Sequence, residues 1–103
     1  MRHLEILKEA MAGTLESSDM LVTVRPNPEE GLDISLESNV MAMFGKQIIG
    51  TAKAVCAEMG VTRAILELKD KGAIDCVIRA RVAAALCRAS ETHYDWAKED
   101  CHE

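Results

Sequence analysis

Aromatic side chains are scarce in this sequence, which carries only Phe44, Tyr94 and Trp96 among its 103 residues. Such a composition offers a poor stacking surface for nucleic-acid bases. A basic excess is also missing: the formal net charge is −5, whereas phosphate binding needs lysine and arginine gathered on one face. An anionic membrane surface would repel the same negative charge. We therefore expect neither a nucleic-acid partner nor a membrane partner.

Long apolar runs and closely spaced cysteine pairs are missing as well. No run approaches the roughly 18 apolar residues that a membrane span needs, and the first five residues carry charge where a signal peptide would be apolar. We therefore expect a cytoplasmic protein. The four cysteines form no Cys-x-x-Cys pair of the kind that binds zinc or exchanges disulfides; they are Cys56, Cys76, Cys87 and Cys101. The surroundings of the first three predict buried, reduced thiols.

Motifs of an independent enzyme are absent too. The sequence has no G-x-S-x-G, no H-E-x-x-H and no phosphate-binding loop. Its histidines, His3, His93 and His102, lie near the chain ends, where no predicted element fixes the ring as catalysis requires. The terminal residues 100–103 offer adjacent ligands but not the preorganised positions of a metal site. We expect no catalytic residue and no metal.

Aliphatic residues are plentiful, in patterns typical of one small domain. Hydrophobic residues make up 49% of the chain, which is enough for a single modest core. We expect one domain over residues 1–103, with its core at about 12–90 and a polar tail at 91–103. Residues 1–16 predict a turn or two of amphipathic helix, ended by Gly13.

Runs of β-branched residues and strict alternation of apolar and polar residues predict three strands, at 20–24, 32–37 and 62–69. Pro26 and Pro28 stop the first run, because proline cannot continue a hydrogen-bonded strand. The first two strands are therefore expected to pair as a hairpin.

Apolar residues three or four positions apart predict two helices, over about 40–59 and 73–90. Their expected buried faces include Phe44 in the first helix and Ile74 in the second. The order strand, strand, helix, strand, helix predicts a small α+β domain. Its sheet is three-stranded and mainly antiparallel, with both helices packed on one face.

Two adjacent serines, Ser17 and Ser18, stand between Glu16 and Asp19, just before the first predicted strand. They place hydroxyl groups on a connection that we expect to be exposed. The plainest interpretation is a serine-rich turn whose hydroxyls bond the local backbone. On these residues alone, that interpretation is favoured over a modification site.

Three segments change the balance: Gly13-Thr14-Leu15-Glu16-Ser17-Ser18-Asp19, Asp70-Lys71-Gly72-Ala73-Ile74-Asp75-Cys76 and Ile78-Arg79-Ala80-Arg81-Val82. Over roughly residues 10–90 the chain resembles the acyl carrier (gamma) subunit family of citrate lyase. The resemblance implies a prosthetic group on one serine, the 2'-(5''-triphosphoribosyl)-3'-dephospho-CoA arm in its attached form. Alignment of the segments places it on Ser17, with Ser18 as the alternative.

The resemblance also implies a function and partners. The arm's terminal thiol would hold acetyl and citryl thioesters while citrate is cleaved to acetate and oxaloacetate. The partners would be the alpha subunit (acyl carrier transferase), the beta subunit (citryl lyase) and a separate transferase that attaches the arm. The chain itself would be a non-catalytic carrier.

Three basic residues are candidates for contact with the arm's phosphates or with a partner subunit: Lys71, Arg79 and Arg81. Two other functions remain open at this point. One is the carrier of malonate decarboxylase, which uses the same type of arm. The other is a small α+β ligand-binding or regulatory module whose serines stay unmodified.

Overall fold

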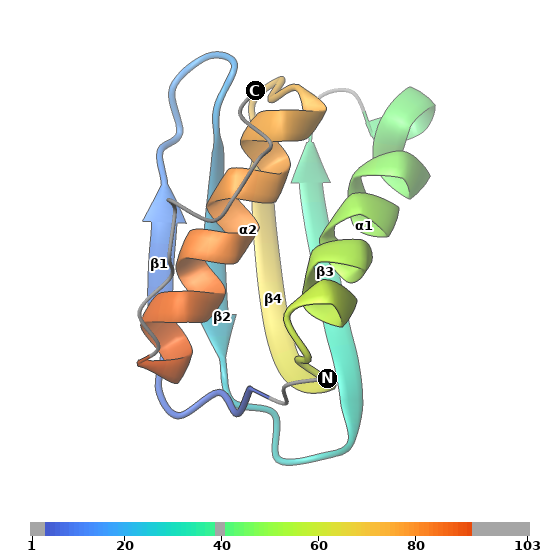
Figure 1. Ribbon diagram of the computed structural model, residues 1–103. Coiled ribbons are helices and arrows are strands. Elements are labelled where there is room, and N and C mark those ends of the chain that lie inside the picture. The colour runs from blue at the N-terminus through green and yellow to red at the C-terminus, as the bar shows by residue number, and fades with distance from the viewer. Residues whose placement is uncertain (1–3, 39–40, 92–103) are drawn as a thin grey trace.

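The computed structural model describes residues 4–38 and 41–91. Six elements follow one another along the chain (Figure 1): β1 Ala10–Gly13, β2 Met20–Arg25, β3 Gly31–Ser38, α1 Met41–Glu58, β4 Arg63–Asp70 and α2 Asp75–Ser90. The predicted tail lies outside the described residues, apart from its first residue, Glu91. So do the three histidines, Tyr94, Trp96 and Cys101. No helix within the described ranges is long and apolar enough to cross a membrane.

The sheet has four strands in the order β1-β2-β4-β3. The prediction of three strands is therefore wrong, because β1 occupies part of the segment expected to form an amphipathic turn. In β1, Ala10 and Ala12 pair with Val24 and Val22 of β2. The run Ala-Met-Ala-Gly contains no polar residue and so shows no alternation of apolar and polar positions. Its extended form is therefore visible only through its pairing with β2.

The expected hairpin between residues 20–24 and 32–37 is also wrong. Strand β4 lies between β2 and β3, antiparallel to β2 and parallel to β3. The parallel pair needs a crossover, which α1 supplies. Two of the three pairings are antiparallel, so the sheet is mainly antiparallel as predicted.

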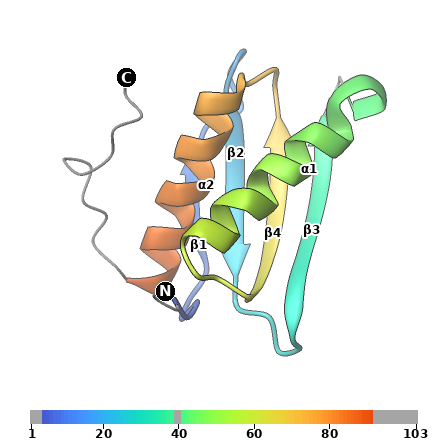
Figure 2. The same ribbon diagram turned by 45° about the vertical axis from the view of Figure 1, so that its right-hand side comes forward.

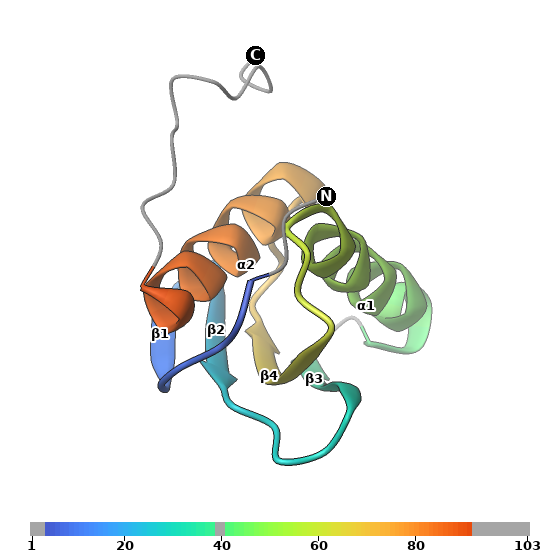
Figure 3. The same cartoon turned by 60° about the horizontal axis from the view of Figure 1, so that its bottom comes forward.

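Both helices cover one face of the sheet (Figures 2 and 3). The side chains that point from the sheet toward them are fully or almost fully buried; they are Met20, Val22 and Val24 of β2 and Ala64, Leu66 and Leu68 of β4. Ile48, Ala52 and Val55 of α1 and Val82 and Leu86 of α2 complete this core. The core is therefore aliphatic, as the shortage of aromatic residues requires.

Phe44 and Ile74 are corrections to the expected helix faces, since they are 44% and 66% exposed. Phe44 lies in the first turn of α1 and Ile74 is the N-cap residue of α2. The helical period places both on the buried sides, but both line a groove between the starts of α1 and α2, which leaves them open to solvent.

Cys76 is a further correction, because its side chain is exposed. Cys56 and Cys87 are buried as free thiols. Burial raises the pKa of both groups, that of Cys56 to about 11. These two thiols are therefore protonated and unreactive near neutral pH.

Gly13 ends β1 with a φ of +99°. A Cβ atom built there would lie 1.8 Å from the backbone oxygen of Met20 and 3.1 Å from Cδ of Arg81. Gly13 thus lets the chain turn close against the start of β2 and against α2. Gly50, inside α1, has no atom within 4 Å of the same position.

We predict opposite effects for alanine at these two glycines. Gly13→Ala should lower the free energy of unfolding by more than about 2 kcal/mol, because it adds both a backbone clash and an unfavourable φ. Gly50→Ala should raise it by up to about 1 kcal/mol, since alanine favours an open helix position. Urea denaturation of both variants checks this; equal stabilities would contradict the described turn.

Candidate functional site

The segment Thr14–Asp19, here called the serine turn, connects β1 to β2 at one end of the sheet (Figure 1). The N–H of Asp19 donates to the carbonyl oxygen of Glu16 at 3.1 Å. This bond closes a β-turn whose two central residues are Ser17 and Ser18. Ser18 has a φ of +68°, which suits a turn that takes a left-handed residue at its third position. A serine in this conformation is uncommon and strained.

Both serine side chains are exposed. Among residues 4–38 and 41–91, neither hydroxyl has a hydrogen-bond partner. The plainer interpretation of the sequence, in which the hydroxyls bond the local backbone, is therefore not what the structure shows. The turn is held by other groups, and the two hydroxyls remain available at its surface.

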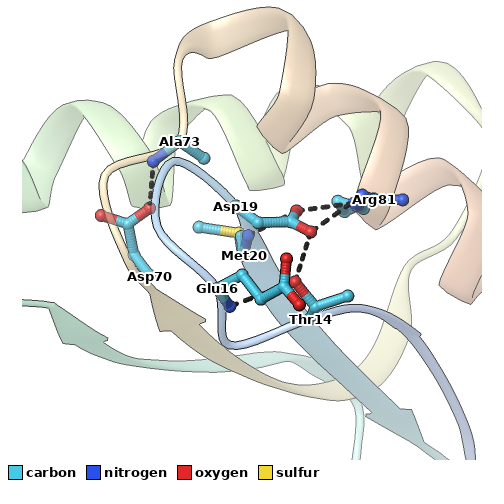
Figure 4. A network of polar contacts seen from close by, with 7 residues as sticks. All are labelled: Thr14, Glu16, Asp19, Met20, Asp70, Ala73 and Arg81. Atoms are coloured by element: carbon cyan, nitrogen blue, oxygen red, sulfur yellow. Dashed lines mark hydrogen bonds and ion pairs between the residues drawn. The ribbon is translucent and has the colours of Figure 1, made fainter.

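The side chain of Asp19 makes most of the hydrogen bonds that fix the serine turn (Figure 4). Arg81 of α2 donates from Nε to Oδ1 at 2.8 Å and from Nη2 to Oδ2 at 2.9 Å, which makes a two-point ion pair. The hydroxyl of Thr14 donates to Oδ2 at 2.7 Å, and the N–H of Met20 donates to Oδ1 at 2.7 Å. One carboxylate therefore binds both ends of the serine turn to the helix. Bidentate arginine–carboxylate pairs are among the stronger and more directional hydrogen-bonded contacts.

The charge of Asp19 is stabilised by these donors. The hydrogen bonds from Arg81 and then from Thr14 hold the pKa of the carboxyl well below its usual range, although partial burial opposes them. The same contact raises the pKa of Arg81. Both groups thus stay charged throughout the neutral range, and the turn keeps its anchor there.

A second anchor comes from β4 and the turn at residues 71–74 that follows it. The N–H of Ser18 donates to the carbonyl oxygen of Lys71 at 2.8 Å. The N–H of Lys71 donates to the carbonyl oxygen of Asp19 at 2.9 Å. Met20 pairs with Asp70, so these bonds continue the β2–β4 ladder beyond the strand ends. The serines therefore stand at the tip of an extended sheet ladder.

The buried carboxylate of Asp70 fixes the turn at residues 71–74 in the same way. Asp70 is only 2% exposed. Its Oδ2 accepts a hydrogen bond from the hydroxyl of Ser38 at 2.9 Å, and its Oδ1 accepts one from the N–H of Ala73 at 3.0 Å. Both oxygens are satisfied, so the carboxylate can be buried without a large penalty.

The structure gives the three basic residues that were predicted as contacts different positions and different partners. Lys71 lies beside the serine turn and makes no ion pair with the described residues. Arg81 also lies there, but it pairs with Asp19. Arg79 pairs with Glu58 of α1 at 2.5 Å and links the two helices.

Sequence reasoning missed the structural roles of Asp19 and Asp70. A signal existed, because each aspartate stands at the end of a predicted strand, next to a turn, where a carboxylate commonly accepts backbone N–H bonds. The partner of Asp19 could not be identified in this way, since Arg81 is 62 residues distant. No three His, Cys, Asp or Glu side chains within the described ranges are placed to hold a metal ion.

Comparison with known proteins adds the family. The family model described as malonate decarboxylase delta subunit matches residues 7–89. A citrate lyase acyl carrier protein of Clostridium perfringens is 46% identical over 97% of this chain and 100% of its own length. One from Escherichia fergusonii is 49% identical over 90% of this chain and 97% of its own. The chain belongs to the citrate lyase acyl carrier protein family.

A further relative, citrate lyase acyl carrier protein 2 of Salmonella typhimurium, is 44% identical over 91% of this chain and 98% of its own. As a member of this acyl carrier family, the chain is a non-catalytic carrier. Membership implies a covalently attached prosthetic group and a multi-subunit lyase complex. The suspected resemblance is thus confirmed at the level of the family.

A solved structure shows the same fold. It is a chain in the crystal structure of a Pseudomonas malonate decarboxylase hetero-tetramer in complex with malonate, with a TM-score of 0.73 at 17% identity. The match covers 84% of this carrier and 89% of that chain. At this identity it supports the fold alone.

The ion pair beneath the serine turn gives a prediction with a pH dependence. Asp19→Asn should lower the free energy of unfolding at pH 7 by about 1–3 kcal/mol, because it removes charge-assisted hydrogen bonds from a largely covered site. The folded pKa of Asp19 is depressed, so its contribution is complete above the unfolded pKa of about 3.9 and is lost as pH falls below it. The gap between wild type and variant should therefore narrow below about pH 4.

Urea denaturation between pH 2.5 and 7 measures this gap. Glu67→Gln is the matched control, since Glu67 pairs with Arg25 at 2.9 Å in a more exposed position. Exposed pairs contribute at most about 1 kcal/mol. An Asp19→Asn effect no larger than that of the control, or one that stays constant down to pH 2.5, would show that the carboxylate does not anchor the turn.

Proposed function

We propose that this chain is the acyl carrier subunit of a citrate lyase, with its prosthetic group on Ser17. The relatives that support this function are named citrate lyase acyl carrier proteins and match nearly the full chain. The observation on which the site depends is the exposed, unbonded hydroxyl of Ser17 on a turn that two aspartates hold in place. A carrier needs one accessible nucleophilic oxygen on a rigid body.

The proposed group is the arm derived from 2'-(5''-triphosphoribosyl)-3'-dephospho-CoA. In the attachment step, Ser17 Oγ bonds to the α-phosphorus of the triphosphate, the bond from that phosphorus to diphosphate breaks, and the hydroxyl proton passes to a base. The product is a phosphodiester, and no oxidation or reduction takes place. Once bound, the group supplies a terminal thiol that carries acyl groups as thioesters.

The residues of the carrier fit such a group. The Ser17 side chain is exposed, so a phosphodiester at Oγ needs no rearrangement of the core. Lys71 adjoins the turn through its backbone, and we propose its ammonium as a contact for the arm's phosphates. We assign Arg81 to positioning the turn through Asp19. Arg79, which pairs with Glu58, is the proposed contact for a partner subunit.

Ser17 is preferred to Ser18 because alignment of the segment Gly13–Asp19 with the family places the arm on the first serine. Both side chains are exposed, so exposure does not separate them. Their backbones differ: Ser18 has a left-handed φ and donates its N–H to Lys71, whereas Ser17 occupies the preceding turn position.

The proposed partners are the alpha subunit (acyl carrier transferase), the beta subunit (citryl lyase) and the transferase that attaches the arm. Tethering keeps the thioester at high effective concentration near the active sites of the first two. The chain has a net charge of −5, and the arm's phosphates add to it. Basic surfaces on the partners would complement this charge. We place this complex in the cytoplasm, where buried free thiols such as Cys56 and Cys87 remain reduced.

A malonate decarboxylase carrier is the second candidate. The family model that matches residues 7–89 favours it, because that model is described as malonate decarboxylase delta subunit. Sequence identities of 44–49% to proteins named for citrate lyase favour the first candidate. Release of oxaloacetate from citrate, rather than consumption of malonate, by the native complex distinguishes the two.

We predict that intact-mass analysis of the natively expressed chain shows the added mass of the arm, located on Ser17 by peptide mapping. Ser17→Ala should abolish the addition. Ser18→Gly should retain it and should stabilise the fold by about 1 kcal/mol, because glycine adopts a positive φ without strain.

The two variants separate the possible outcomes. Loss of the arm in Ser18→Gly with retention in Ser17→Ala would move the site to Ser18. An unmodified wild-type chain in an active native complex would refute the carrier function and favour the ligand-binding or regulatory module with unmodified serines.

A further inference from the structure

Basic side chains differ in whether they have partners within the described part of the chain. The arginines there are all engaged in ion pairs or hydrogen bonds; they are Arg25, Arg63, Arg79, Arg81 and Arg88. Four lysines make neither kind of contact with the described residues: Lys46, Lys53, Lys69 and Lys71. The first two lie on α1, whereas Lys69 and Lys71 line one hollow.

This hollow has a volume of about 360 Å³ and lies at the end of the sheet that carries the serine turn (Figure 1). Strands β3 and β4 both end there. Its lining residues come from the serine turn, β3, β4 and the turn at residues 71–74; they are Leu15, Glu37, Ser38, Lys69, Asp70 and Lys71. Lys71 is hydrogen-bonded to the backbone of Ser18 and Asp19. The hollow is therefore next to the turn that carries Ser17.

Lys69 and Glu37 lie opposite each other in the β3–β4 pair. They alternate with Leu68 and Leu36, which pack toward the helices, so both side chains lie on the open face of the sheet. No ion pair joins the two. The ammonium groups of Lys69 and Lys71 are thus available to an anion from outside the described chain.

Two other hollows are less suited to an anion. The groove of about 320 Å³ between the starts of α1 and α2 has two aspartates and no basic residue in its lining. A hollow of about 580 Å³ beside Pro26 and Pro28 includes Arg63. That guanidinium already binds two carbonyl oxygens and pairs with Glu30. The hollow beside the serine turn is therefore the best match among the three.

The proposed arm is an anion that would be fixed next to this hollow. Its dephospho-CoA part carries a diphosphate and an adenine ring. The two ammonium groups match the diphosphate, and Leu15, which is 52% exposed, gives the ring an apolar surface. Sites for small ligands have volumes of roughly 300–1,000 Å³. The hollow lies near the lower end of this range, so we assign only the nucleotide part of the arm to it.

The charges of the lining predict weak binding. Lys69 and Lys71 are opposed by two carboxylates, Glu37 and Asp70, and exposed charge pairs contribute little in water. We therefore expect a Kd for free ligand of about 1 mM or more. A flexible tether gives an effective concentration on the order of millimolar. The attached arm can thus occupy a site that free ligand fills poorly, and it can leave that site again.

We propose that this hollow is a resting site for the nucleotide part of the arm. Lys69 and Lys71 contact its diphosphate, and the charge of Glu37 keeps the binding weak. This inference rests on the proposed carrier function and goes beyond it by assigning a site for the arm on the folded body. Docking there is reversible and forms no covalent bond.

The test uses backbone amide signals of the full chain, measured by NMR. The chain without the arm is titrated with dephospho-CoA, and the signals of Glu37 and Lys69 should shift saturably with a Kd in the millimolar range. The same two signals should differ between chains with and without the arm. Neither residue belongs to the serine turn, so attachment at Ser17 alone should leave them unchanged. The difference should shrink in about 1 M NaCl, where the Debye length is about 3 Å.

Lys69→Gln with Lys71→Gln should raise the Kd for dephospho-CoA at least about fivefold, because both contacts to the diphosphate are lost. Lys46→Gln with Lys53→Gln is the matched control. It removes the same charge from α1 and should change the Kd less than about twofold. Circular dichroism and urea denaturation establish that the variants are folded.

Glu37→Gln should lower the Kd about two- to fivefold, because it removes a charge that repels the diphosphate. It should also enlarge the difference at Lys69 between chains with and without the arm. This variant keeps both lysines, so it tests the site even where the double lysine variant accepts no arm.

Three results would overturn the assignment: equal Kd values in the two double variants, a Glu37→Gln variant that binds no more tightly than wild type, or differences confined to the serine turn when the arm is attached. An arm on Ser17 with unchanged signals at Glu37 and Lys69 removes the resting site alone. A native chain that carries no arm in an active complex removes the carrier function, and the resting site with it.

Discussion

The ion pair between Asp19 and Arg81 is the contact on which the candidate site depends. It joins a short turn between two strands to the helix that packs over them, across 62 residues of sequence. Fixing each turn residue costs roughly 1–2 kcal/mol of backbone entropy, and the turn contributes almost nothing to the core to offset this. The carboxylate, with its donors from Arg81, Thr14 and Met20, compensates locally. Without it, Ser17 would be one residue of a mobile loop.

A rigid attachment point and a mobile arm perform different tasks. In the proposed carrier, the arm must reach several active sites, which requires flexibility, whereas the enzyme that loads it must find a hydroxyl in a defined position. The sheet provides this definition because the β2–β4 ladder continues through Lys71 to the serine turn. Under the proposed attachment, flexibility can then begin at the phosphodiester on Ser17. The strained φ of Ser18 is consistent with this arrangement, since strain persists where surrounding bonds determine the conformation.

The sequence predicted the local elements well and their arrangement less well. The helices expected at 40–59 and 73–90 run from Met41 to Glu58 and from Asp75 to Ser90, because a period near 3.6 is visible in any window of that length. Strand β1 was missed because its sequence, Ala-Met-Ala-Gly, has no polar residue and so shows no alternation. The pairing of β4 between β2 and β3 was missed because alternation identifies a strand but not its neighbours. Phe44 and Ile74 were assigned to the core because periodicity does not reveal that a groove opens between the starts of the two helices.

For the site, as for the fold, the sequence identified local segments but not the contacts between residues distant in the chain. The three matching segments pointed to Ser17, Lys71, Arg79 and Arg81. Nothing in the spacing shows that Arg81 is engaged by Asp19 while Lys71 makes no ion pair with the described residues. That distinction matters for function. An arginine held by two hydrogen bonds to a carboxylate can bind a phosphate only by giving up part of the pair that keeps the turn in place. In the proposed carrier, Lys71 can respond to the arm's phosphates at no such cost, so the two basic residues beside the serine turn are suited to different tasks. Arg81 holds the proposed attachment hydroxyl in place, and Lys71 can meet the arm.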